Sequence, residues 1–215
     1  MNKKAIIEKT KNYVKRSMRN EEPGHDWWHT YRVLKMAKRI AREEKADMFI
    51  VELVALLHDI ADWKFHGISA GPKKIREWLG SLGVDKENID HVIEIVQESY
   101  FKGSGVPDKM RTIEGKVVQD ADRLDAVGAI GIARVFTYAG YKKNLIFIPE
   151  IKPRKNMKFS EYKKGDVTAI NHFYEKLLLL KDRMNTKTGK KLAERRHRFM
   201  ERYLKQFFKE WNGKE

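Results

Sequence analysis

The chain has 215 residues, of which 41% are hydrophobic and 35% charged, a composition that fits one globular domain with a sizeable core. No apolar stretch approaches the roughly 20 residues that span a bilayer, and the amino terminus lacks the apolar segment and cleavage site of a secretory signal. We therefore expect a soluble, cytoplasmic protein. Cysteine is absent, which excludes disulfides, thiolate ligands and cysteine nucleophiles, so any metal must be held by nitrogen and oxygen.

The net charge is strongly positive. There are 45 Lys and Arg residues against 30 Asp and Glu, a formal charge of +15, which favours a polyanionic partner such as a nucleotide or nucleic acid. Many of these basic residues alternate with acidic ones at helical spacing, as they do over residues 38–45, which is typical of a solvated helix face. Both interpretations stay open at this stage.

Apolar residues recur every three to four positions through most of the chain, which predicts an all-α fold. The first helix is expected over residues 4–19, ended by a polar run and Pro23-Gly24. Asp26 is a predicted N-cap for a long second helix with His29 in its first turn, and Asp47 for a helix over residues 48–62. Apolar residues surround nearly the whole of that third helix, so it should form the centre of the core.

The second half of the chain predicts further helices, one of them interrupted. Gly71 and Pro72 should break the chain before the next helix, and Asp85 or Asn88 should begin the one after it. A helix from about residue 112 carries glycines that weaken it, so we expect a break near Gly128. Residues 140–165 predict a long basic surface loop. The helices are expected over residues 73–83, 88–99, 112–136, 166–184 (with Asp166 as N-cap) and 188–211.

An adjacent His58-Asp59 pair interrupts the most apolar predicted helix. A buried ionised carboxylate needs a cation, a metal or a dense hydrogen-bond network, and residues 48–61 contain no Lys or Arg. Imidazole beside carboxylate suits a divalent ion such as Mn, Fe, Ni or Zn. From the residues alone, a metal ligand pair and a hydrogen-bonded core histidine are both open interpretations.

Another apolar segment contains three carboxylates within six consecutive positions. Asp122 and Asp125 share a helix face, whereas Asp120 lies on a different one. Each carboxylate alone is typical of an acidic helix turn or of an ion pair with Arg123. Three together favour a binding or catalytic role.

These segments resemble a known family. The order HxxRV (His29 to Val33), HDxxD (His58 to Asp62) and DRLDA (Asp122 to Ala126) is similar to the HD superfamily of metal-dependent phosphohydrolases, and closest to the small bacterial YedJ/YpgQ-type group. The segments ALLHDIADWKF, VVQDADRLDAVGAIGIARVF and RRHRFMERYLKQFFKEW look like blocks of that group, so the resemblance spans nearly the whole chain.

The resemblance implies an HD-type helical bundle in a single domain over residues 1–215. It comprises a metal-binding core (about 20–135), the basic loop (about 140–165) and C-terminal helices packed on the core (about 166–212). It also implies one divalent metal ion (Mn, Fe, Ni, Co or Zn), held by side chains from separate helices. Carried over position by position, the metal ligands are His29, His58, Asp59 and Asp122.

Further residues are candidates for chemistry around that metal. Asp62 lies one helical turn after His58, where several HD enzymes carry an acid that assists proton transfer; the alternative is a helix-end carboxylate paired with Lys64. The candidates for substrate binding are Lys64, Arg123, His25 and Arg32, each of which also fits a surface or supporting role. This chain has Glu98 where relatives commonly carry a histidine, which leaves specificity open.

We expect a hydrolase that cleaves a nucleotide phosphoanhydride or phosphomonoester with a metal-activated water. A phosphodiesterase acting on cyclic nucleotide or RNA is the first alternative, favoured by the net charge and the basic loop. The second is a nucleotide-binding or nucleic-acid-binding module whose metal is structural. The metal's identity, the substrate and the oligomeric state stay open.

Overall fold

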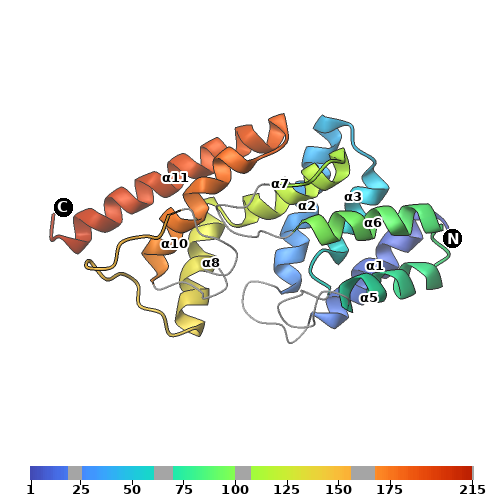
Figure 1. Ribbon diagram of the computed structural model, residues 1–215, viewed down its shortest axis with the longest axis horizontal. Coiled ribbons are helices and arrows are strands. Elements are labelled where there is room, and N and C mark those ends of the chain that lie inside the picture. Colours follow the sequence, from blue (N-terminus) through green and yellow to red (C-terminus); the bar gives the residue numbers. More distant parts are fainter. Residues whose placement is uncertain (19–25, 61–69, 100–107, 156–167, 215) are drawn as a thin grey trace. The chain divides into compact units, whose positions relative to one another are not determined.

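The computed structural model describes the chain except for residues 19–25, 61–69, 100–107, 156–167 and 215 (Figure 1). The described residues form helices joined by turns and loops, and their only ladder contact is an isolated bridge between Leu145 and Thr168. The predicted all-α fold is confirmed. Within this part of the chain, no helix is both long enough and apolar enough to cross a membrane.

The chain divides into two compact units. One lies within Met1–Phe101 and Asp108–Ala121, and the other extends over Asp122–Glu215. Helix α7 (Ile113–Asp125) contributes residues to both. The prediction of a single domain over the whole chain stays a prediction, and each unit is described by itself below.

Helix α3 (Met48–Leu57) is the centre of the first unit, as its sequence predicts. It packs against α1 (Lys3–Ser17), α2 (Trp27–Glu44) and α6 (Lys86–Glu98), and α5 (Ala70–Ser81) packs on α6. Every residue of α3 from Phe49 to Leu57 is buried except Glu52. Because this helix is apolar on all sides, neighbours on several faces are needed to remove it from water.

Aspartates cap three of these helices at their amino ends, as predicted. Asp26 accepts a hydrogen bond from the His29 N–H (2.8 Å), Asp47 from that of Phe49 (2.7 Å) and Asp85 from that of Asn88 (2.9 Å). Hydrogen bonds from the Asn88 backbone and side chain hold the pKa of the Asp85 carboxyl below its ordinary value. This cap therefore stabilises the fold above the unfolded-state pKa, and its contribution is lost as the pH falls through the folded-state pKa.

Two helix boundaries differ from those expected. Helix α3 ends at Leu57, so His58 and Asp59 lie in the turn that follows it and not within a helix running to residue 62. Helix α5 begins at Ala70, so Gly71 and Pro72 form its first turn and do not break the chain before it. Proline is tolerated there because the first N–H groups of a helix have no intrahelical partner.

The predicted break near Gly128 is confirmed, between α7 and α8 (Gly128–Tyr141). Gly128 has a φ of +79°, in the region that favours glycine, and a Cβ at this position would lie 3.0 Å from the Arg196 side chain. The Arg196 guanidinium in turn donates to the Leu124 carbonyl at the end of α7. A glycine here permits both the turn and this close approach.

The second unit is built on α8, the short α10 (Ala169–Glu175), the 3-10 helix η1 (Leu177–Arg183) and the long α11 (Lys187–Trp211). Helix α11 packs against α8 and η1 (Figure 1). The single helix expected over residues 166–184 is wrong, because Thr168 caps α10 and the chain turns at Lys176. The expected N-cap Asp166 lies outside the described residues. The threefold repeat of a 3-10 helix places Leu177 and Leu180 on one side, and both are buried.

The described part of the predicted basic loop, residues 142–155, is fixed to α10. Leu145 and Ile146 accept hydrogen bonds from the first two backbone N–H groups of α10, each at 3.0 Å. The Glu175 carboxylate, only 1% exposed, accepts bonds from the Arg154 backbone N–H (2.9 Å) and Nε (3.0 Å). Arg154 is thus an internal ion-pair partner and not a free cation of the loop.

We expect Arg154→Ala to destabilise the protein by about 3 kcal/mol, because it leaves the Glu175 carboxylate buried without its cation. Urea unfolding followed by circular dichroism measures this change. The matched control is Arg76→Ala, which removes an exposed pair with Asp90 (2.6 Å) and should cost less than about 1 kcal/mol. Equal losses for the two variants would contradict the role given to Glu175.

Candidate metal centre

Three of the predicted metal ligands meet in the first unit. The Nε2 atoms of His29 and His58 lie 3.3 Å apart, and the Asp59 Oδ2 lies 3.4 Å from the former and 3.5 Å from the latter. Both histidines are buried, and the Asp59 side chain is 7% exposed. Two ring nitrogens and one carboxylate oxygen thus form a nearly equilateral triangle.

The start of α2 positions His29. Asp26 is the N-cap residue, and its carboxylate accepts a hydrogen bond from the backbone N–H of His29. This bond fixes the first turn of the helix, where the ring of His29 is 1% exposed. The predicted placement of His29 in a capped first turn is confirmed.

The end of α3 positions His58 and Asp59. The His58 Nδ1 donates to the Ala55 carbonyl at 2.9 Å, because a carbonyl can only accept. In the neutral ring this leaves the lone pair on Nε2, the atom that faces His29 and Asp59. A hydrogen bond of this kind holds metal-ligating imidazoles in orientation and selects their tautomer.

The same hydrogen bond explains why α3 ends where it does. In a continued helix, the Ala55 carbonyl would accept from the N–H of Asp59. Here it accepts from the His58 ring, and the Ile60 N–H bonds to Leu57 in a tight turn. Consecutive residues can then turn their side chains toward the same point.

The donor set fits a divalent cation. Ligand atoms bound at about 2.1 Å to one ion, at tetrahedral or octahedral angles, lie about 3.0–3.4 Å apart; the three observed separations are 3.3, 3.4 and 3.5 Å. Within the described ranges, these three residues are the group that can hold a metal ion. Nitrogen and oxygen donors suit Mn, Fe, Co, Ni or Zn, and the geometry does not select among them.

The carboxylates of α7 differ in their surroundings. Asp120 is fully buried, Asp125 is 5% exposed and Asp122 is half-buried. Asp125 is paired with Arg134 of α8 at 2.9 Å, a structural ion pair within the second unit. Asp122 belongs to that unit, whereas the three clustered residues belong to the other. Its role as a fourth ligand stays a prediction.

Both arginines among the candidates for substrate binding lie within described helices. Arg123 is buried, and its guanidinium donates to the Arg183 carbonyl at the end of η1, an anchor that the sequence could not indicate because the two residues are 60 positions apart. Arg32 is half-buried on α2, one turn after His29. The substrate-binding role of each stays a prediction.

Three other candidates, His25, Asp62 and Lys64, lie outside the described residues. Glu98 is half-buried and is the last residue of α6. His91, which lies two turns earlier on that helix, pairs with Glu114 of α7 at 3.7 Å. Glu114 also accepts from the Asp47 N–H at 3.0 Å, which links α7 to the start of α3.

Comparison with known proteins identifies the class. The HD domain family model matches residues 27–127, a range that includes all four predicted ligands. Over 209 residues the chain is 41% identical to the uncharacterised protein YpgQ of Bacillus subtilis, covering 96% of this chain and 94% of YpgQ. The chain therefore belongs to the HD-domain family, and the resemblance to the YpgQ-type group is confirmed.

Solved structures agree over the full length. The chain is similar to an HD-superfamily hydrolase from Bacillus thuringiensis, with 46% identity and a TM-score of 0.78 over 98% of this chain and 99% of that one. The crystal structure of Bacillus subtilis YpgQ in complex with ADP has 38% identity and a TM-score of 0.78, covering 98% and 97%. The class is thus that of the HD-superfamily hydrolases.

We expect His58→Ala to lose the metal, because it removes one of three convergent donors. Protein loaded with Mn²⁺ or Zn²⁺ and passed through a desalting column is assayed for bound metal by mass spectrometry. Wild type should retain one ion per chain, and the variant substantially less. His91→Ala, which removes a half-buried histidine of the same unit, is the control and should retain metal. Equal retention by all three proteins would rule out this site.

Proposed function

We propose that the chain is a metal-dependent phosphohydrolase that cleaves a nucleotide at a phosphoanhydride or phosphomonoester bond. The observation that carries the proposal is the buried triangle of His29, His58 and Asp59, with donor atoms 3.3–3.5 Å apart. Three protein ligands leave coordination positions for water and substrate, as catalysis requires. Asp122 is the proposed fourth ligand, on the strength of the DRLDA motif.

Each residue has a defined task in this proposal. The Ala55 carbonyl holds the His58 imidazole in place, and the Asp26 cap fixes the backbone of the turn that carries His29, so the ligand geometry exists before substrate binds. A bound divalent ion would polarise the phosphoryl oxygen and lower the pKa of a coordinated water. Asp62 accepts or donates the proton, and Lys64, His25 and Arg32 contact the phosphate oxygens.

Arg123 is proposed for substrate binding only in second place, since its guanidinium already donates to the Arg183 carbonyl. That contact favours the alternative role of holding the end of α7, the helix that carries Asp122. A positioning role of this kind affects the ligand geometry and not the substrate contact itself.

A nucleotide is the proposed substrate class because the YpgQ structure contains ADP and because the net charge of +15 attracts anions. The alternative of a phosphodiesterase drew on the basic loop for support. That support is weaker now, since Arg154 is occupied by Glu175.

We expect metal-dependent release of phosphate or pyrophosphate from at least one nucleotide in a panel of ribo- and deoxyribonucleoside mono-, di- and triphosphates. The assay contains Mn²⁺, Co²⁺ or Ni²⁺, and malachite green and a coupled pyrophosphate assay detect the products. Asp59→Asn should lower the rate at least about 100-fold, whereas His91→Ala should leave it unchanged. Metal binding without turnover of any nucleotide would favour a binding module with a structural metal.

We expect Asp62→Asn to lower kcat by about 100-fold or more while the metal content stays that of wild type, because a general acid or base acts on the proton and not on the ion. Metal analysis and steady-state kinetics on the same preparation separate the two effects. Unchanged kcat would exclude the proton-transfer role, and lost metal would instead make Asp62 part of the metal site.

A further inference from the structure

Helix α11 carries a stripe of positive charge along one face. Its 25 residues include nine Lys or Arg and three Glu, a surplus of six that is a large part of the +15 of the whole chain. At 100° per residue, seven of the nine fall within an arc of about 80°, over a length of about 33 Å. These seven, all exposed, are Lys187, Lys191, Arg195, Arg198, Arg202, Lys205 and Lys209.

The stripe is not neutralised within the described part of the chain. None of its seven members is in an ion pair there. Glu201 lies beside the stripe, but its carboxylate is 3.3 Å from the His197 ring on the other side. Successive members are three or four residues apart, so neighbouring like charges repel one another. An external anion would relieve this repulsion.

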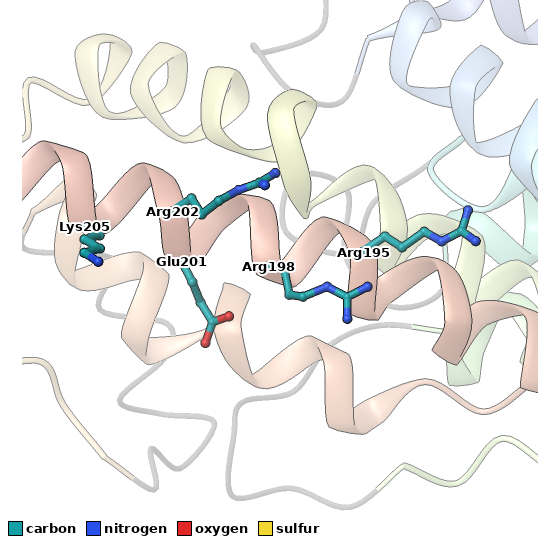
Figure 2. Close-up of a pocket in the computed structure, with 5 residues that line it drawn as sticks. All are labelled: Arg195, Arg198, Glu201, Arg202 and Lys205. Carbon is teal, nitrogen blue, oxygen red and sulfur yellow. The ribbon is translucent and has the colours of Figure 1, made fainter.

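Part of the stripe lines a surface depression of about 530 Å³, bordered by Arg195, Arg198, Glu201, Arg202 and Lys205. Figure 2 shows that all five side chains extend from α11. Three of the four cations are arginines, whose planar guanidinium groups bind phosphate oxygens in pairs. A row of such groups over several helical turns suits a row of phosphates better than a single one.

Two features favour a single strand over a duplex. Phe199, 41% exposed, lies at the edge of the stripe with the Arg202 guanidinium 5.9 Å from its ring centre, where an unpaired base can stack. Glu194 and Glu201 border the other edge. A helix seated in a major groove meets phosphates on both flanks, and these carboxylates would repel the second strand.

We propose that the basic stripe of α11 binds the backbone of a single-stranded nucleic acid, with Phe199 stacking on one base. RNA and DNA share the phosphodiester chemistry that the stripe recognises, so either can be the source. This binding is independent of the hydrolytic reaction proposed above, because every residue that carries it belongs to α11.

The test is fluorescence anisotropy of labelled 12-residue oligo(U) and oligo(dT) with the full-length protein, over a series of salt concentrations. Gel analysis after each titration confirms that the oligonucleotide is intact. For wild type, log K should fall linearly with log salt, with a slope of about −0.7 per phosphate contacted. Arg198→Ala/Arg202→Ala should weaken binding and reduce that slope by about 1.4.

Two further variants separate the contributions. Arg39→Ala/Arg42→Ala removes the same charge from exposed positions of α2 and should leave the slope unchanged. Phe199→Ala should weaken binding about fivefold or more without changing the slope. Tighter binding of a duplex of equal length, equal binding of polyglutamate, or equal effects of the two double-arginine variants would overturn the proposal.

Discussion

A carboxylate buried against two imidazoles is the constraint around which the first unit is organised. Removing the charge of Asp59 from water costs free energy unless a cation balances it. In the cluster, its carboxylate lies 3.4 Å from the His29 ring and 3.5 Å from the His58 ring. Local hydrogen bonds at the start of α2 and at the end of α3 fix this arrangement. A cap holds the start of α2, and a side-chain hydrogen bond ends α3 so that two consecutive residues reach one point. A divalent ion would turn this costly cluster into a stabilising one, which couples metal binding to folding.

The excess of basic residues divides into groups with different physical roles. Arg123, Arg154 and Arg196 are internal: each donates to a carbonyl or carboxylate within the second unit. Others alternate with acids on solvated faces, as residues 38–45 do. Those of the α11 stripe lie in a row with no acidic partner in the described chain. Net charge alone therefore does not identify a binding surface, since a buried guanidinium and an exposed one count equally toward +15.

The two helices that end earlier than expected share one cause. A helix predicted from periodicity continues until something competes for its backbone or its buried face. At Ala55 the competitor is the His58 ring, which takes the carbonyl. After Glu175 it is packing, because a 3-10 turn buries Leu177 and Leu180 together while the Glu175 carboxylate stays with Arg154. Neither the side-chain hydrogen bond nor the 3-10 packing changes the 3.6-residue spacing of apolar residues from which helices are predicted.

The sequence by itself determined the helical class, the central position of α3, the three aspartate caps and the break at Gly128, because each depends on residues within a turn or two of one another. It also determined the family, through motifs that keep their spacing. Tertiary structure decided which polar residues meet. His29 and His58 are 29 positions apart, Arg123 and Arg183 are 60, and Arg196 reaches Leu124 across 72. Such contacts depend on how helices pack, and no local pattern encodes the distance between two side chains that the chain brings together only on folding.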